Sequence, residues 1–383
     1  MNDRERYRVA LVDWLGCAHA GAGRPAAQAA RAAGDSLLDR VTAAGCAGHA
    51  LDYDDTFTPG LVHASAPVAP AVLLLAAELG RDLDAALDAF AAGWEATAAL
   101  ARASHPALYE RGWHPTAVCG TVGAAIGSAR LLGLDDERAR DAAALALVRS
   151  GGLRAAFGTA GKAVQVGGAA AGGLQAARLA AAGVEAPLEA VARGPAGFEQ
   201  AFGGTWAEPD GVPAVRENWI KAYPCCLGTH GPIEAALALR ESGRRPERIT
   251  VVVHPLARQA AARDDVADGL AAKFSIPYLV AFSLLHGAPD VESFDTIDAP
   301  ARALARESIT VTLDGSLGEM EARIEAGGET LARIETALGS PARPMDAARL
   351  ERKLHELAGR RLDGALDDLA APAQSVVAAA GLT

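Results

Sequence analysis

The sequence predicts a mainly α-helical protein that carries a smaller α/β unit toward its C-terminal end. The first observation is that 50% of the 383 residues are hydrophobic and 22% are charged, which is enough apolar material for a buried core. The second is that aromatic residues make up only 5% while alanine and glycine are abundant, a combination that favours closely packed helices. The third is a change in hydrophobic periodicity near residue 244. A chain of this length predicts two domains, or one large domain with an insertion.

Apolar residues recur mostly at helical spacing from the N-terminus to about residue 243. In the segment 83–103 they repeat every three or four positions, which predicts a helix. Pro115 occupies a place where a first helical turn tolerates proline, and Gly133 supplies a stop for the helix that follows. Asp135 or Asp136 is expected to cap the next helix. Within the helix after Pro115, small-residue spacing predicts close contact with neighbouring helices at Gly120, Gly123 and Gly127.

Two β-branched runs, 247–254 and 307–314, predict strands after the change in periodicity. Between them, the segment 272–287 predicts a helix entered through Pro277. The segment 319–339 is expected to begin as a strand, and its second half fits a strand or a helix. Beyond residue 344 the helical pattern resumes and is expected to run to the end of the chain.

These patterns predict two domains. We expect a helical domain formed by residues 1–243 and completed by residues 343–383, and an α/β lid domain formed by residues 244–342. A cleft between unequal domains is a common place for a substrate site.

The charge balance and the cysteines restrict the partners and the compartment. With 36 basic and 47 acidic residues the net charge is −11, which argues against nucleic acid or an anionic membrane as the main partner. No signal peptide and no run long enough to span a membrane is expected. The 5 cysteines contain no C-x-x-C pair, so neither a disulfide framework nor a zinc ribbon is indicated. We expect a cytoplasmic protein.

The first candidate cluster is the segment 51–63, where Asp52, Asp54 and Asp55 precede His63 in a loop that contains glycine and proline. Three carboxylates and a histidine can orient an imidazole, bind a metal ion or exchange protons with a substrate. The D-x-D-x-D-G pattern of a calcium loop is absent, and we expect no metal site. The alternative interpretation is a solvated acidic turn ahead of the next helix.

His114 stands directly before Pro115 and the start of a predicted helix. The dipole at a helix N-terminus disfavours the imidazolium form, which suits a neutral base or donor near pH 7. The alternative is a helix cap packed on Trp113.

Lys162 lies in the glycine-rich segment 158–173 at the approach to another helix. Backbone amides at a helix N-terminus and one lysine can together hold a carboxylate or a phosphate. The segment is not a Walker A motif, because Ala163 follows the lysine. The glycines by themselves also fit tight helix packing.

The segment 218–237 gathers several reactive side chains ahead of a further helix: Lys221, Tyr223, Cys225, Cys226 and His230. A nucleophilic Cys–His pair is one interpretation, and buried small side chains are the other. Lys273 and Tyr278 stand at the start of the helix predicted over 272–287. Lysines hold carboxylates, and histidine or tyrosine transfers protons, so the combination of clusters predicts a site for a small polycarboxylate.

Four stretches carry a resemblance to a known family: HALDYDDT, GWHPTAVCGTVGAAIGSARLLGLD, KAYPCCLGTHGPIEAAL and AKFSIPYLVAFSLLHG. In this order they are similar to the MmgE/PrpD family, which includes 2-methylcitrate dehydratase, cis-aconitate decarboxylase and iminodisuccinate epimerase. The resemblance implies a large helical domain to which the C-terminus returns, a smaller α/β lid and a homodimer. It also implies chemistry on di- or tricarboxylic acids without a cofactor.

Carried over residue by residue, the resemblance implies a cleft that contains Asp52, His63, His114, Lys162, Lys221 and Tyr278. To align both Asp52 and His63 with the family pattern, a one-residue gap is needed in the loop between them. Cys226 stands where the decarboxylase has a histidine. Gln165 begins a Gln-Val-Gly-Gly run where the dehydratase-like pattern has His-x-Gly-Arg. The loss of an imidazole and a guanidinium implies a substrate with fewer or differently placed carboxylates.

The function expected from this reading is a lyase that abstracts a proton α to a carboxylate and expels water. His114 is the expected general base or acid, with Asp52 and His63 beside it and Tyr278 as a proton donor. Lysines are expected to hold carboxylates and to stabilise the enediolate; these are Lys162, Lys221 and Lys273. Cys226 and Gln165 are expected to contact the substrate.

Three alternatives stay open at this point. An epimerase would return the proton to the opposite face of the carbon, for example with His114 and Lys221 on the two sides. A decarboxylase would act on a related polycarboxylate. A relative without catalysis would only bind a carboxylate ligand or a partner protein.

Overall fold

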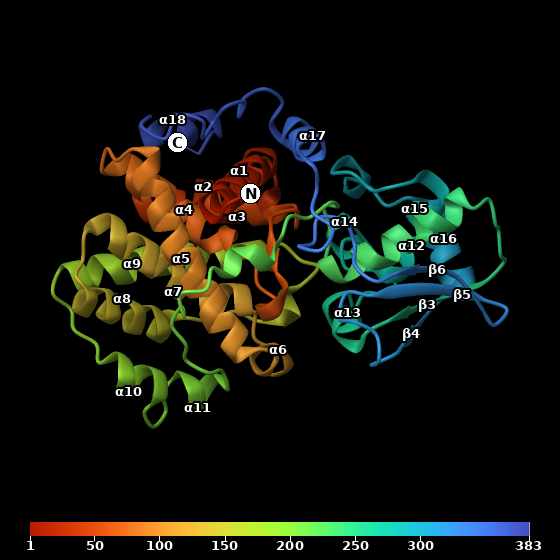
Figure 1. Ribbon diagram of the computed structural model, residues 1–383, viewed down its shortest axis with the longest axis horizontal. Helices are drawn as coiled ribbons and strands as arrows, with labels where there is room; N and C mark the ends of the chain where they lie inside the picture. The colour runs from red at the N-terminus through yellow and green to blue at the C-terminus, as the bar shows by residue number, and fades with distance from the viewer. Residues whose placement is uncertain (383) are drawn as a thin grey trace.

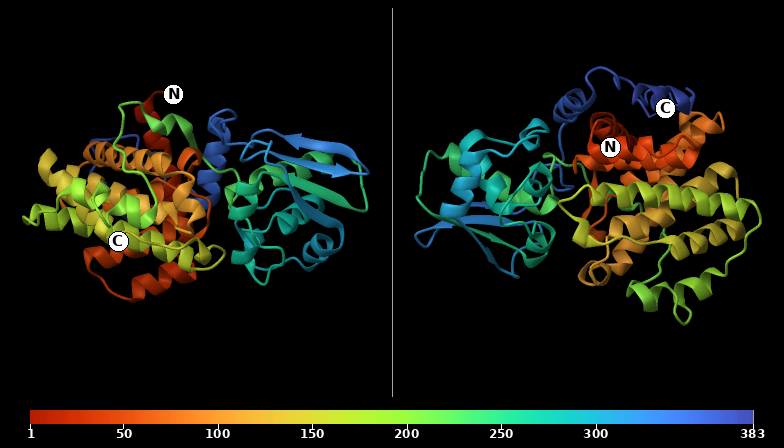
Figure 2. Two further views of the ribbon diagram at one scale, coloured as in Figure 1. Left: turned by 90° about the horizontal axis from the view of Figure 1, so that it is seen from below. Right: turned by 180° about the vertical axis from the view of Figure 1, so that it is seen from behind.

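The computed structural model describes residues 1–382, and the chain forms two lobes of unequal size (Figure 1). The larger lobe is helical and contains the N-terminal and the C-terminal helices. The smaller lobe projects from one end of it in all views (Figure 2). The helices of the larger lobe are α1 (Asp3–Gly21), α2 (Pro25–Ala32), α3 (Leu37–Ala50), α4 (Ser65–Glu78), α5 (Leu83–Ser104), α6 (Ala107–Glu110), α7 (Pro115–Leu132), α8 (Asp136–Arg149), α9 (Gly161–Ala181), α10 (Leu188–Arg193), α11 (Phe198–Phe202), α17 (Ala347–Ala358) and α18 (Ala373–Ala379).

Close packing of α5, α7 and α9 forms the centre of the larger lobe. A Cβ atom added to Gly123 of α7 would lie 2.5 Å from the carbonyl oxygen of Gly93 on α5, and one added to Gly127 would lie 2.9 Å from that of Ala89. Gly120 has the same close approach to Pro67 of α4. The predicted role of these glycines in close helix contact is therefore confirmed.

The predicted boundaries of α7 and α8 are also confirmed. Pro115 begins α7, and Gly133 ends it with a φ of 68°, a left-handed conformation that glycine adopts without strain. Asp135 is the N-cap of α8, where its carboxylate accepts a hydrogen bond from the backbone N–H of Arg138.

The smaller lobe contains a four-stranded sheet covered by helices. Its elements are α12 (His230–Glu241), β3 (Ile249–Val253), α13 (Pro255–Ala260), α14 (Gly269–Ala272), α15 (Ile276–His286), α16 (Ala299–Ser308), β4 (Ile309–Leu313), β5 (Ala322–Ala326) and β6 (Glu329–Ile334). The strand order is β4-β3-β5-β6. Val251 of β3 is in register with Val311 of the parallel β4 and with Ile324 of the antiparallel β5. Both predicted strands and the helix through Pro277 are present, and the ambiguous segment after residue 327 is a strand.

The C-terminal part returns to the larger lobe, where α17 packs on α1 and α18 packs on α4. The prediction of one helical run to the end is wrong, because residues 359–372 separate the two helices and Gly359 and Gly364 take left-handed φ values. In the smaller lobe, α12 packs against β5, β6 and α15, so its packing begins before residue 244. The use of this lobe as a lid stays a prediction.

A short two-stranded sheet joins two segments that are far apart in the sequence. β1 (Thr56–Phe57) pairs antiparallel with β2 (Asn218–Trp219). The pairing places the loop after α3 beside the segment that carries Lys221. Over residues 1–382, none of the helices has both the length and the apolar character needed to cross a bilayer.

Candidate active site

The acidic segment of the sequence forms a buried loop between α3 and α4. Asp52, Asp54 and Asp55 are each at most 3% exposed, so the alternative of a solvated acidic turn is wrong. Asp52 has a φ of 52°, in the left-handed region that a non-glycine residue seldom occupies. Such backbone strain is maintained only where the surroundings hold the residue in place, and it is most common at functional sites.

Asp52 is held by two ammonium groups. Its Oδ1 atom lies 2.7 Å from Nζ of Lys162 and 3.1 Å from Nζ of Lys221. Lys221 also donates to the carbonyl oxygens of Asp52 and Cys225 at 2.9 and 3.0 Å. Burial alone raises the pKa of Asp52, but the two ammonium groups outweigh it and hold that pKa well below its usual range. The carboxylate is ionised, and Lys221 is committed to holding the loop.

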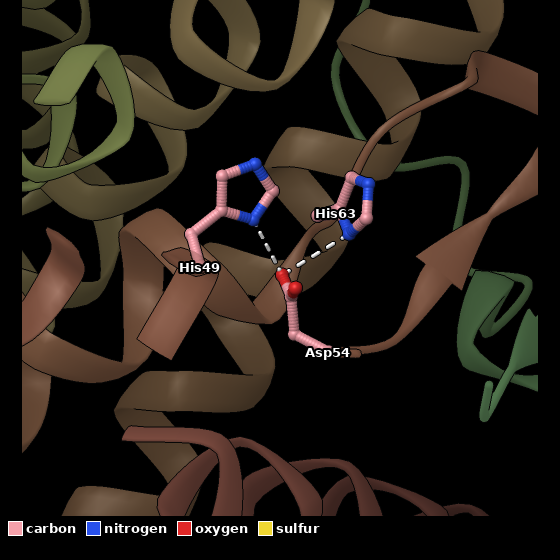
Figure 3. A group of neighbouring side chains, drawn as sticks. All are labelled: His49, Asp54 and His63. Atoms are coloured by element: carbon pink, nitrogen blue, oxygen red, sulfur yellow. Dashed lines mark hydrogen bonds and ion pairs between the residues drawn. The ribbon is translucent and has the colours of Figure 1, made fainter. Parts of the chain in front are cut away.

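Asp54 joins two histidines. The Nδ1 atoms of His49 and His63 lie 2.8 and 3.1 Å from the Oδ2 atom of Asp54, and both rings point toward this carboxylate in Figure 3. Nε2 of His63 lies 3.5 Å from Oδ1 of Asp52, so the loop continues the network to the lysines. Burial lowers the pKa of His49 to about 4 and also lowers the pKa of His63. Both rings are therefore neutral near pH 7.

His49, Asp54 and His63 are also the group that could hold a metal ion among residues 1–382, because their ligand atoms lie within 4.8 Å of one another. In the structure Nδ1 of His49 is hydrogen-bonded to Oδ2 of Asp54, and Nδ1 of His63 lies close to the same oxygen without a hydrogen bond. His49 was not among the predicted site residues. The sequence did contain an indication of its role, because His49 is the first residue of the HALDYDDT stretch that resembles the family.

Asp55 has a structural role. Its carboxylate accepts hydrogen bonds from Oγ of Ser65 and Nδ2 of Asn218, both at 2.7 Å, and from Nε1 of Trp94 at 3.3 Å. These donors come from α4, β2 and α5, so Asp55 fixes the loop to three elements. Burial raises the pKa of Asp55 to about 6.

His114 is the N-cap residue of α7, but its side chain does not cap the helix. Its Nδ1 atom lies 3.1 Å from Oε1 of Gln165, and its ring packs edge-on against Phe157 at 4.9 Å. The Nε2 atom is buried without a hydrogen-bond partner. Burial, assisted by the charge of Lys162, holds the pKa of His114 well below its usual value. His114 is a neutral imidazole with a free ring nitrogen.

These groups line one pocket where the two lobes meet. Its polar walls come from Asp52, His63, His114 and Lys162, and Cys226 lies beside them. The smaller lobe contributes Ala260, Phe274 and Met320. The remaining lining residues are Thr56, Leu61, Tyr109, Thr116, Phe157, Leu227 and Gly228. Thr56 and Tyr109 have buried hydroxyl groups without a partner, and sequence patterns gave no signal for either.

The two cysteines do not form a nucleophilic pair with His230. Nε2 of His230 lies 3.4 Å from the carbonyl oxygen of Cys225, and the thiol of Cys225 contacts Oγ1 of Thr229 at 3.1 Å. Burial raises the pKa of Cys226 to about 11 and that of Cys225 to about 12, so both thiols are protonated near neutral pH.

Four of the predicted site residues do not line the pocket, and one of them is Lys221, which holds the Asp52 loop. Lys273 donates to the carbonyl oxygens of Leu51 and Pro224, and burial lowers its pKa to about 7. Tyr278 is 1% exposed in the core of the smaller lobe, where its hydroxyl accepts a hydrogen bond from the backbone N–H of Asp298 at 3.0 Å. Gln165 is not among the lining residues, and its amide contacts Leu153 and His114. None of these four side chains lines the pocket that contains His114.

Taken together, the pocket sets a free imidazole nitrogen beside an ammonium group, within walls that are otherwise largely apolar. An arrangement of this kind suits proton transfer next to a bound anionic group, since low polarity strengthens the interaction between the charges.

Comparison with known protein families identifies the family to which the chain belongs. Residues 37–208 match the MmgE/PrpD N-terminal domain, and residues 223–374 match the MmgE/PrpD C-terminal domain. The chain belongs to the MmgE/PrpD family.

Curated relatives are cis-aconitate decarboxylases. The protein from Mus musculus is 30% identical over 277 residues, which cover 65% of this chain and 55% of the relative. The protein from Homo sapiens is 31% identical over 51% of this chain and 43% of the relative. The protein from Aspergillus terreus is 28% identical over 82% of this chain and 73% of the relative. The matches therefore span about half the length of the two mammalian relatives.

Proposed function

We propose that this protein is a lyase that removes CO₂ from a small unsaturated di- or tricarboxylic acid, with His114 transferring a proton at its Nε2 atom. The observation that carries the proposal is the free Nε2 of His114 in a pocket that also contains the ammonium group of Lys162. The relatives named as cis-aconitate decarboxylases favour decarboxylation over the dehydration that the sequence alone suggested.

Each group has a defined part in this reaction. As the carbon–carbon bond to the leaving CO₂ breaks, its electron pair moves into the conjugated system, and a proton is added at the carbon next to a remaining carboxylate. His114 first takes up a proton from solvent at its free Nε2 atom and then delivers it to this carbon. Burial holds the pKa of His114 well below its usual value, so the imidazolium is a strong donor once it has formed. Lys162 holds a remaining carboxylate, and its position is fixed by the ion pair with Asp52.

The apolar wall supports the loss of CO₂. Phe157 and Phe274 line the pocket, and Nζ of Lys162 lies 5.6 Å from the centre of each ring. A carboxylate placed against these rings loses part of its hydration, whereas neutral CO₂ does not need hydration. Cys226 stands where the decarboxylase pattern has a histidine, and its thiol is protonated near neutral pH. Because this position holds no imidazole, the proposal assigns the proton donor to His114.

The test is direct. The purified full chain is incubated with cis-aconitate and with a panel of unsaturated and hydroxylated di- and tricarboxylates, and products are followed by proton NMR together with CO₂ release. His114→Ala is the matched control for background reaction. CO₂ release that depends on His114 supports the proposal. Formation of an alkene from a hydroxy acid without CO₂ would overturn it in favour of dehydration. Exchange of the α proton with solvent without any net product would favour the epimerase.

A further inference from the structure

Gln165, which the sequence suggested as a substrate contact, is engaged by the protein at both ends of its amide. Its Oε1 atom accepts a hydrogen bond from the backbone N–H of Leu153 at 2.9 Å, and its Nε2 atom donates to the carbonyl oxygen of Leu153 at 3.2 Å. The same Oε1 atom lies 3.1 Å from Nδ1 of His114. The amide therefore connects α9 to Leu153 and to His114, the N-cap residue of α7.

The chemistry of Leu153 fixes which end of the amide faces His114. A backbone N–H can only donate and a backbone carbonyl can only accept, so the atom beside Leu153 N must be the amide oxygen. That oxygen is an acceptor, and the ring nitrogen facing it must carry a hydrogen. The orientation follows from the backbone pair and does not depend on the usual ambiguity between amide oxygen and nitrogen.

We infer that Gln165 is a positioning residue that holds His114 in the tautomer with hydrogen on Nδ1, so that Nε2 is the atom that exchanges a proton in the pocket. The inference rests on the proposed function only for the proton transfer itself. The tautomer is a property of the protein without substrate.

The surrounding backbone is built for this contact. Gly152 has a φ of 126°, and a Cβ atom there would lie 2.7 Å from Oε1 of Gln165 and 2.9 Å from Cβ of Ala117. The carbonyl oxygen of Gly152 also accepts the backbone N–H of His114 at 3.0 Å. A glycine at this place lets the segment approach closely enough to share the amide oxygen. The Oε1 atom of Gln165 thus lies within reach of both the backbone N–H of Leu153 and Nδ1 of His114.

Histidine-selective ¹⁵N NMR tests the inference without substrate, because two-bond correlations report the tautomer and the pKa of each ring. The His114 signals are assigned by their loss in His114→Ala. We expect hydrogen on Nδ1 in the wild type. Gln165→Leu removes the acceptor and should produce a mixture of tautomers. Gln165→Glu keeps the acceptor and adds a negative charge, which should raise the pKa of His114 by about 1 to 3 units.

A matched control separates this role from loosening of the segment. Arg154 is the residue after Leu153, and its Nη1 atom donates a hydrogen bond to Oε1 of Gln259 at 3.2 Å. Gln259→Leu removes this acceptor and leaves the contacts of His114 with Gln165 in place. It should leave the tautomer and the pKa of His114 unchanged. If Gln165→Leu does not fold, Gln165→Glu decides the matter alone. Hydrogen on Nε2 in the wild type, or an unchanged His114 pKa in Gln165→Glu, would overturn the inference.

Turnover provides a second reading. If the proposed function is correct, the pH limb assigned to His114 in kcat/KM should shift in Gln165→Glu by the same amount as the NMR pKa. If the protein has no lyase activity, the NMR result still decides the role of Gln165. A failure of the proposed function is thereby distinguished from a failure of the positioning role.

Discussion

Replacement of Lys353 by methionine should destabilise the protein, because it leaves a buried carboxylate without its partner. Lys353 lies on α17 and is 3% exposed, and its Nζ atom is 2.6 Å from Oδ1 of Asp13 on α1. The same ammonium group donates to the carbonyl oxygen of Tyr53 at 2.8 Å, one residue after Asp52. The ammonium group of Lys353 therefore connects the C-terminal part of the chain both to α1 and to the candidate active-site loop.

The expected magnitude follows from burial and from the pKa of Asp13. Breaking a buried ion pair by removing one partner typically costs about 3–5 kcal/mol. Burial raises the pKa of Asp13 to about 6 even with Lys353 present. The pKa in the unfolded chain is about 4, so the folded state binds more protons between these values and stability falls as the pH rises through them.

The loss in Lys353→Met should therefore depend on pH. Without Lys353 the folded-state pKa of Asp13 rises further, and stability continues to fall above pH 6 by about 1.4 kcal/mol per pH unit. At pH 8 the cost reaches about 3 kcal/mol, in agreement with the range for a broken buried pair. At pH 5 Asp13 is mostly protonated in both folded proteins, and the cost of the substitution should be much smaller.

Urea unfolding followed by circular dichroism and tryptophan fluorescence at pH 5 and pH 8 measures this difference. Arg352→Met, on the exposed side of α17, is the matched control and should change stability by less than about 0.5 kcal/mol. The double variant Asp13→Leu with Lys353→Met should recover most of the loss, since no buried charge remains unpaired. A cost below about 1 kcal/mol at pH 8, equal to that at pH 5, would refute the reasoning.

Four further outcomes are expected. His114→Ala should fold normally and lose about 10² to 10⁴ in turnover, measured by CO₂ release; a loss of stability with full turnover would instead indicate a packing role. If His114 is the proton donor, kcat/KM should rise as the pH falls toward its lowered pKa, and a fall would indicate a base. Cys226→Ser should keep the reaction type, because the thiol of Cys226 is protonated in the wild type and alkylation of that thiol near pH 8 should be slow. Loss of all activity with intact folding would indicate thiol chemistry. Gly123→Ala should lower the urea midpoint through the clash with Gly93, and an unchanged midpoint would show that the two helices can separate freely.

Local patterns predicted much of the fold because they depend on neighbouring residues. Pro115 and Gly133 bound α7 as expected, since a fixed φ favours a helix start and a left-handed φ favours a helix end. The β-branched runs formed β3 and β4. The second half of the segment 319–339 was ambiguous because its strand identity depends on pairing with β5, a contact that lies outside any local window.

The candidate site was only partly predictable for the same reason. The sequence indicated Asp52, His63, His114 and Lys162, which do line one pocket. It also indicated Tyr278, whose hydroxyl meets the backbone of Asp298 in the smaller lobe. Spacing along the chain identifies side chains able to do chemistry, but it does not say which way each one faces after folding.

The sequence by itself determined the helical character, the position of the α/β unit and the inventory of reactive groups. Tertiary structure decided their roles. It paired Lys162 with Asp52, bound Lys221 to the Asp52 loop, and made Gln165, a presumed substrate contact, the partner of His114. The physical reason is that periodicity and capping depend on residues a few positions apart. Ion pairing, burial and the resulting pKa values depend instead on atoms that the fold brings together from segments 50 to 170 residues apart.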